Sequence, residues 1–202
     1  MERAIGLHSP TARPPIWRRL FHLGVGSSIP VVAIFSSAGV MVGLMATLSG
    51  MALVMEAARF RLPNLNQWLV GRLRPLLKQA EDRRITGASY IAVSALVCFL
   101  AFDKPITITA LFFLSLGDPA AALVGSRMRG VRFLGKSPGG TLAFAAVSLA
   151  TVGVLSAAGV VPFHWGLLVG AVVAAIVELG PSVVDDNLTI PLISGAVMTT
   201  LV

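Results

Sequence analysis

The chain has 202 residues, of which 55% are hydrophobic and 12% are charged, and its net charge is +7. A soluble domain carries about 25% charged residues, so this composition excludes a soluble domain of ordinary surface. The apolar residues form blocks of about 20 residues between short charged stretches, which is the pattern of membrane spans. We therefore predict an all-α, polytopic transmembrane bundle of about six or seven helices. Because the basic residues fill the gaps between the apolar blocks, we expect no nucleic-acid partner.

The chain divides into a polar N-terminal segment, residues 1–17, and a single transmembrane domain, residues 18–202. The expected spans cover about residues 20–35, 40–58, 87–102, 106–125, 141–160 and 165–179. A last apolar stretch, residues 188–202, is short for a full crossing at about 1.5 Å per residue. The longest connection, residues 59–84, mixes arginines with leucines and Trp68 at roughly helical spacing. That mixture predicts an amphipathic helix on the cytoplasmic surface of the membrane.

The distribution of lysine and arginine predicts the topology. With the N-terminus in the cytoplasm, residues 1–19, 59–84 and 126–136 all lie inside, and of the 16 Lys and Arg only Lys104 lies outside. Such a bias towards cytoplasmic loops is the positive-inside pattern. The same orientation brings the loops after residues 125 and 179 to the cytoplasmic face, where we expect the active-site loops.

Asp118 interrupts the fourth apolar block, within the sequence Gly117-Asp118-Pro119. A carboxylate inside a span costs about 2.5–3.5 kcal/mol on insertion scales, so it should face a cavity or a partner. Gly117 can end one helical segment, and Asp118 can cap a second segment that starts with Pro119. The pattern therefore predicts a broken helix near residues 117–119, which is tolerated where it lines a cavity. The alternative is a capping Asp with no further role.

A basic, glycine-rich segment covers residues 125–140 and reads GSRMRGVRFLGKSPGG. Its cations can neutralise phosphates, and its glycines allow backbone amides to approach a ligand closely. Gly130, Gly135 and Lys136 match the P-loop spacing by count, but no strand precedes them, so the P-loop context is missing. Read alone, the segment is also explained by positive-inside topology. The residues predicted here to bind nucleotide or phosphate are Arg127, Arg129, Gly135, Lys136, Ser137, Gly140 and Thr141.

Acidic residues gather in the segment 178–191, which reads ELGPSVVDDNLTIP. Asp185 and Asp186 are adjacent carboxylates followed by the amide of Asn187, and hard oxygen ligands of this kind suit Mg²⁺. Glu178 lies about two helical turns before them. We predict a magnesium site at Asp185 and Asp186, with Asn187 near the nucleotide. The alternative is an interfacial turn rich in Asp and Asn.

Two pairs of residues nearer the N-terminus are candidates for contact with a lipid or its headgroup. Arg19 and His22 stand at the start of the first apolar block. Glu56 and Arg59 stand at the end of the second block, three residues apart, and a pair at that spacing shares one helix face.

The motifs GDPAAALVGSRMRG, GKSPGGTLA and AAIVELGPSVVDDNLTIP together resemble the CTP-dependent lipid kinases. That family includes dolichol kinase, phytol and farnesol kinases and CTP-dependent diacylglycerol kinase. The N-terminal RRLFHL and the pair Glu56 and Arg59 resemble further elements of it. The resemblance covers most of the chain, and the Asp-Asp-Asn-x-x-x-Pro element is its most specific part. One departure is Gly139, where the family often has a glutamate.

The resemblance implies transfer of the terminal phosphate of CTP to the hydroxyl of a lipid alcohol, with Mg²⁺ as the divalent cation. Asp118, Asp185 and Asp186 would then bind the metal, and Asp118, Glu178 and Asp186 would be the catalytic acids. Whether Asp118 binds the metal or takes the proton of the lipid alcohol stays open, as Glu178 could also take that proton. The motif order is also loosely similar to phosphatidate cytidylyltransferases. A transporter with a site at Asp118 is an alternative of another class.

Overall fold

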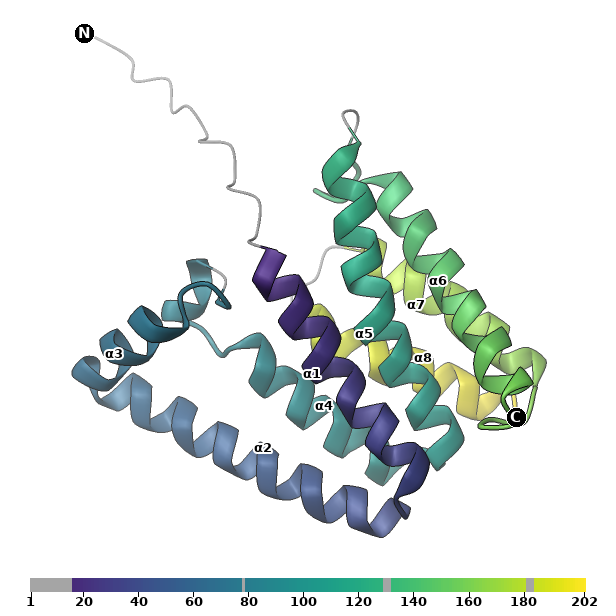
Figure 1. Cartoon of the computed structure of the whole chain (residues 1–202), viewed down its shortest axis with the longest axis horizontal. Coiled ribbons are helices and arrows are strands. Elements are labelled where there is room, and N and C mark those ends of the chain that lie inside the picture. The colour runs from purple at the N-terminus through teal and green to yellow at the C-terminus, as the bar shows by residue number, and fades with distance from the viewer. Residues whose placement is uncertain (1–15, 78, 129–131, 181–183) are drawn as a thin grey trace, which may run out of the picture.

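The computed structural model describes residues 16–77, 79–128, 132–180 and 184–202. In these ranges every regular element is helical, apart from one isolated bridge between Phe133 and Lys136, and the prediction of an all-α chain is confirmed. Figure 1 shows the helices as one bundle, with α2 at one side, α6 and α7 at the other, and α5 between them. The helices are α1 (Ile16–Phe35), α2 (Ala38–Arg61), α3 (Pro63–Leu73), the short 3₁₀ helix η1 (Gln79–Asp82), α4 (Gly87–Ala101), α5 (Lys104–Arg127), α6 (Pro138–Ala157), α7 (Trp165–Leu179) and α8 (Asp186–Thr200).

N-cap side chains fix the starts of several helices. Ser37, Thr86, Ser137 and Asp185 occupy N-cap positions, and each accepts a hydrogen bond in its side chain from a backbone N–H of the first turn. Such caps satisfy donors that the first helical turn leaves without a partner. The predicted apolar blocks therefore match α1, α2 and α4 to α8 to within a few residues at each end.

The central helix is α5, which packs on α1, α6, α7 and α8 and is buried over most of its length. Small residues allow the close approach on both sides. On the α1 side, Ser27 donates to the hydroxyl of Ser115 at 3.1 Å. On the α6 side, Gly117 lies under the ring of Phe144, which is fully buried. Close packing through small residues is typical of helices in membranes, where burial from water drives association weakly.

The prediction of a broken helix near residues 117–119 is wrong, because α5 continues through Gly117, Asp118 and Pro119. A proline inside a helix removes one backbone hydrogen bond and costs about 3 kcal/mol when nothing compensates. Neighbouring helices surround α5, and packing of this kind lets membrane helices keep a proline. Gly117 does not end a segment; its missing side chain makes room for the Phe144 ring.

Polar contacts gather many helix ends at one end of the bundle, which we call the basic end. His22 of α1 lies 3.9 Å from Asp118 of α5, measured from Nε2 to Oδ2. Asn187, at the start of α8, donates to the carbonyl of Gly87 at the start of α4. At the opposite end, Lys104 donates to carbonyls next to the α1–α2 turn. The other described lysines and arginines fall in residues 18–19, 59–84 and 127–136, at the basic end.

Three helices, α2, α5 and α6, are long and apolar enough to cross a membrane, and α1, α4 and α7 are shorter apolar helices. The outer helix α2 exposes much of its apolar surface, including Met51 and Val54, which are 65% and 70% exposed. An apolar surface of this extent suits contact with lipid. The connection predicted to be amphipathic contains α3 and η1, and α3 buries none of its side chains fully.

Replacing Gly140 by alanine should destabilise the fold. A Cβ there would lie 2.9 Å from the backbone oxygen of Ala121, which no side-chain rotation can relieve. Overpacking of this kind costs about 1–3 kcal/mol. Gly153→Ala, on the same helix with nothing within 4 Å of the new Cβ, should instead leave stability unchanged or raise it by about 0.5–1 kcal/mol. Thermal unfolding of both variants in detergent measures the difference; equal stabilities would contradict the observed packing of α6 on α5.

Candidate functional site

Four side chains from three separate segments meet at the basic end, and we call them the ion cluster: Lys136, Thr141, Glu178 and Asp186. The ammonium of Lys136 lies 2.7 Å from Oδ2 of Asp186 and 3.3 Å from Oε1 of Glu178. The hydroxyl of Thr141 donates to Oε2 of Glu178 at 2.9 Å. The structure therefore brings together residues that were predicted separately as phosphate ligands and as acids.

A tight turn aims Lys136 at the acids. Leu134 and Gly135 both have positive φ, at 52° and 85°. Phe133 and Lys136 exchange two backbone hydrogen bonds of 2.8 and 2.9 Å across them. Positive φ at both central positions is the geometry of a two-residue type I′ turn, which favours glycine at the second position. Gly135 thus has a role in the turn, besides its predicted role near a phosphate.

Helix starts position the other members of the ion cluster. Ser137 caps α6 by accepting from the N–H of Gly140 at 3.1 Å, which sets Thr141 on the first turn. Asp185 caps α8 by accepting from the N–H of Asn187 at 3.1 Å, which sets Asp186 at the first helical position. Helix N-termini carry a partial positive charge and favour nearby anions. Two such ends face the space around Lys136.

The charges of the ion cluster hold the pKa of Lys136 above its ordinary value of 10.5. Burial opposes this by disfavouring the charged ammonium, but the hydrogen bond and charge of Asp186, followed by those of Glu178, outweigh the burial. The side chain of Glu178 is 6% exposed. A carboxylate at this depth is stable as long as a cation lies beside it. The ion cluster therefore holds one cation, the Lys136 ammonium, between two carboxylates.

The predicted acids do not all converge on the ion cluster. Asp186 and Glu178 belong to it, Asp185 caps α8, and Asp118 faces His22 on α1. In the described ranges, no group of three or more His, Cys, Asp or Glu side chains is arranged to hold a metal ion. Glu178 and Asp186 form an acid pair that shares one cation, the ammonium of Lys136.

Glu56 and Arg59 form a second, buried cluster, which we call the Glu56–Arg59 network. Arg59 donates from Nε to Oε2 of Glu56 at 2.6 Å, and its other nitrogens donate to Asn66 and to the carbonyls of Glu81 and Arg84. The other carboxylate oxygen, Oε1, accepts from the N–H and hydroxyl of Thr86 and the hydroxyl of Ser89 at 2.8–3.0 Å. The network ties α2 to the connection and to α4. Its groups bind one another, which differs from the predicted contact with a lipid headgroup.

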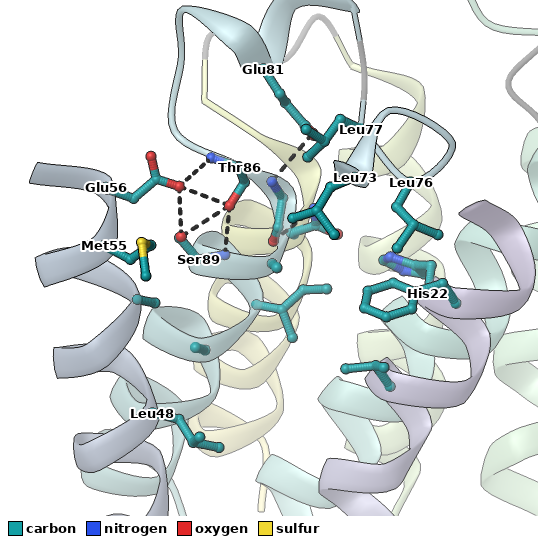
Figure 2. Close-up of a pocket in the computed structure, with 18 of the residues that line it drawn as sticks. His22, Leu48, Met55, Glu56, Leu73, Leu76, Leu77, Glu81, Thr86 and Ser89 are labelled. Atoms are coloured by element: carbon teal, nitrogen blue, oxygen red, sulfur yellow. Dashed lines mark hydrogen bonds between the residues drawn. The ribbon is translucent and has the colours of Figure 1, made fainter. Parts of the chain in front are cut away.

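Between α1, α2, α3 and α4 lies a cavity of about 530 Å³, which we call the α1–α2 cavity. Figure 2 shows Leu48 and Met55 of α2 on one wall and His22 of α1 on the other. Leu73, Leu76 and Leu77 cover it from the connection (Figure 2). Polar groups gather at the basic end of this cavity; they are His22, Glu56, Arg59, Glu81, Thr86, Ser89 and Asn187.

Asn187 joins the cavity to the ion cluster. Its side chain lines the α1–α2 cavity and donates to the carbonyl of Gly87 at 3.5 Å. The preceding residue, Asp186, holds Lys136. Consecutive Cα atoms are about 3.8 Å apart, so the α1–α2 cavity and the ion cluster are neighbours at the start of α8.

The remaining predicted residues lie around these features. Arg127 is exposed on the last turn of α5, and Arg129 lies outside the described residues. Arg19 is half-buried near the start of α1. Sequence reasoning missed the α1–α2 cavity and the partners of Arg59, because leucines and alanines at helical spacing give no signal that distinguishes a cavity wall from packing. Thr86 and Ser89 carried the one usable signal, a helix cap before an apolar run.

No family model, no curated protein and no solved structure matches the chain. What the site can do is therefore read from its own charges, burial and geometry.

Replacing Lys136 by methionine should destabilise the protein in a pH-dependent way. The raised pKa of Lys136 means that its stabilising effect is present at all pH values below about 10.5 and is lost as the pH rises through the folded value. Without the ammonium, Glu178 and Asp186 repel one another at neutral pH, at a cost of about 1–3 kcal/mol. The deficit should shrink as the pH rises above about 10.5, because the wild-type protein then loses the ammonium charge that the variant lacks.

Unfolding of the wild type and of Lys136→Met in detergent at about pH 8 and above about pH 11 checks this expectation. The double variant Lys136→Met with Glu178→Gln should recover part of the lost stability, because it removes one of the two repelling charges. A deficit that is equal at both pH values, with no recovery in the double variant, would show that the ion pair does not stabilise the fold.

Proposed function

We propose that the chain is an integral membrane kinase that transfers the terminal phosphate of CTP to the hydroxyl of a lipid alcohol. The observation that carries the proposal is that Asp186 of the ion cluster is followed directly by Asn187, which lines the α1–α2 cavity. A lipid kinase needs a site that binds the donor phosphates and an apolar site for the lipid, placed so that the lipid hydroxyl reaches the terminal phosphorus. Few other functions require a cation-bridged acid pair beside a cavity lined with leucine, methionine and alanine.

The donor set fits a divalent cation. Glu178 and Asp186 present carboxylate oxygens on either side of one ammonium, and Mg²⁺ is bound through one or two carboxylates plus substrate phosphates. Glu178 and Asp186 would hold the metal, which supplies charge neutralisation of the phosphates. Lys136, released from these acids, would bind the phosphates, with the first turn of α6 beside it.

Phosphoryl transfer depends mainly on positioning and on neutralising charge. The lipid hydroxyl oxygen forms a bond to the terminal phosphorus of CTP, the bond from that phosphorus to the bridging oxygen breaks, and CDP leaves. The hydroxyl proton passes to a carboxylate. Asp118, which faces the cavity residue His22, is one candidate for this role, and Glu178 is the other if Asp186 holds the metal without it. The polar end of the cavity would hold the hydroxyl between them.

The proposal includes a polytopic topology with the basic end in the cytoplasm, where CTP is available. A cysteine at Arg84 or Arg127, both exposed at the basic end, should react in intact cells only with a membrane-permeable reagent. A cysteine at Phe163, which is 64% exposed in the α6–α7 turn, should react with an impermeable reagent. The native Cys98 is buried and should stay unlabelled. Labelling of residue 127 from outside would contradict the proposed site, because the nucleotide would then lack access.

The central test of the function is Asp186→Asn. The amide keeps the shape but removes a charge from the proposed metal site, so CTP turnover should fall by roughly two orders of magnitude or more. Lys136→Ala should instead raise the KM for CTP more than it lowers kcat, because it removes phosphate binding. Purified protein is incubated with labelled CTP, Mg²⁺ and a panel of lipid alcohols, and the products are separated.

Asp103→Asn is the matched control. It removes the same charge at the opposite end of the bundle, and the Asp103 side chain makes no capping hydrogen bond to α5. It should keep full turnover. Formation of CDP and a lipid monophosphate is the expected result. Pyrophosphate with a CDP-lipid would make the protein a cytidylyltransferase, and solute uptake without nucleotide turnover would make it a transporter. Normal turnover by folded Asp186→Asn would refute the metal assignment.

A further inference from the structure

The α1–α2 cavity lies between two helices that are joined by a short turn and then diverge. Helix α1 packs on α5, whereas α2 packs on α4 and α3. Figure 1 shows α1 and α2 diverging from their connection towards the basic end. Their facing walls line the cavity. A molecule in the surrounding bilayer could therefore enter sideways between the two helices.

We propose that this cavity binds the hydrocarbon chain of a neutral lipid alcohol, which enters between α1 and α2 with its hydroxyl at the basic end. The inference rests on the proposed function and names its acceptor as an uncharged lipid, not a lipid phosphate. The walls suit a hydrocarbon chain, because they are largely apolar away from the basic end. They are formed by Phe21, Val25 and Ile29 of α1, Met45, Leu48, Ala52 and Met55 of α2, and Ala88, Ile91 and Ala92 of α4.

The length of the cavity matches one leaflet. Met45 and Met55 both line it and lie ten residues apart on α2, which corresponds to about 15 Å of helix. Half of a bilayer's hydrocarbon core is also about 15 Å thick. A lipid lying with its head at the basic end would thus have its chain inside the cavity as far as the middle of the bilayer.

The charges at the polar end favour a neutral head. Among the described lining residues Arg59 is the one permanent cation, and its donors are directed at Glu56, Asn66 and backbone carbonyls. Glu56 and Glu81 also line this end. A phosphate head would approach the carboxylate of Glu56, whose partner Arg59 already directs its donors at protein groups, and like charges at close range cost several kcal/mol. A hydroxyl needs only ordinary hydrogen-bond partners.

Such partners are present at the junction with the ion cluster. Asn187 offers an amide, and His22 lines the cavity with Nε2 buried and without a hydrogen-bond partner. A buried polar atom without a partner costs free energy, which a hydroxyl placed against His22 would recover. Asn187 directly follows Asp186, so a hydroxyl held by its amide would lie near the ion cluster, where the proposed function puts the donor phosphate.

Small residues in the cavity lining allow its proposed occupation by a lipid chain to be tested. Ala52 on α2 and Ala92 on α4 line it from two sides, and a phenylalanine at either would fill the space a chain occupies. Ala57 is exposed on α2 and does not belong to the lining. Ala57→Phe is therefore the matched control.

The experiment measures binding directly, without nucleotide. The purified full chain is irradiated with a long-chain alcohol that carries a diazirine on its chain, and labelled peptides are identified by mass spectrometry. We expect labels on α1, α2 and α4, competition by the unlabelled alcohol, and no competition by its phosphate ester. Ala52→Phe and Ala92→Phe should reduce labelling about tenfold, equivalent to about 1.4 kcal/mol, whereas Ala57→Phe should not.

The two substitutions lie on different helices, so whichever variant elutes as folded protein gives the test. Unchanged labelling in a folded cavity variant, or labels confined to other helices, would overturn the inference even if CTP is consumed. Competition by the phosphate ester or by a diacyl phospholipid would overturn the choice of a neutral occupant. Asp186→Asn should keep full labelling while losing turnover. If the wild type is labelled as expected but phosphorylates no lipid alcohol, the cavity assignment stands and the kinase proposal fails.

Discussion

The ammonium of Lys136, held between Glu178 and Asp186, is the interaction on which the arrangement of the basic end depends. It joins the α5–α6 loop to the end of α7 and the start of α8, which come much later in the sequence. Because Glu178 is buried, the cation cannot be removed without leaving a charge in a poorly solvated place. Under the proposed function a divalent cation would bind the same acids, so Lys136 would leave them without either carboxylate losing a neighbouring cation. Stability and nucleotide binding would then draw on the same pair of carboxylates.

The Glu56–Arg59 network fixes the other side of the basic end. A buried ion pair stabilises little by itself, because desolvation offsets most of the attraction. Arg59 also donates to carbonyls of the connection, and Glu56 accepts from the first turn of α4. Its effect is therefore to specify where the connection crosses the bundle. That placement lets Leu73, Leu76 and Leu77 close the α1–α2 cavity from above, so a polar network determines the shape of an apolar site.

Much of the fold could be predicted from the sequence, because apolar blocks and helix caps are local signals. The predicted spans 87–102 and 165–179, for example, fall on α4 and α7. The interruption at Gly117-Asp118-Pro119 was misread, since local propensity favours a break there and the tertiary packing of α5 overrides it. Lys136 and Glu178 were both recognised as candidates, but their direct pairing depends on the turn at Leu134 and Gly135 and on the approach of α7. The cavity could not be foreseen, because its walls differ from a packed core only in how far two helices diverge.

Gly139 shows how the site departs from the family that the sequence resembles. A Cβ at this position would meet Sδ of Met128 at 1.9 Å, so a glutamate there would have to displace the Met128 side chain. The chain instead brings a carboxylate to the start of α6 from α7, where Glu178 accepts from Thr141 and pairs with Lys136. An acid therefore lies close to Lys136 although residue 139 is a glycine. The acid from α7 ties the end of that helix to Lys136. Helix α7 packs on α8, and α8 carries Asp186 and Asn187, so the packing of these two helices sets the positions of both acids and of the amide that lines the cavity.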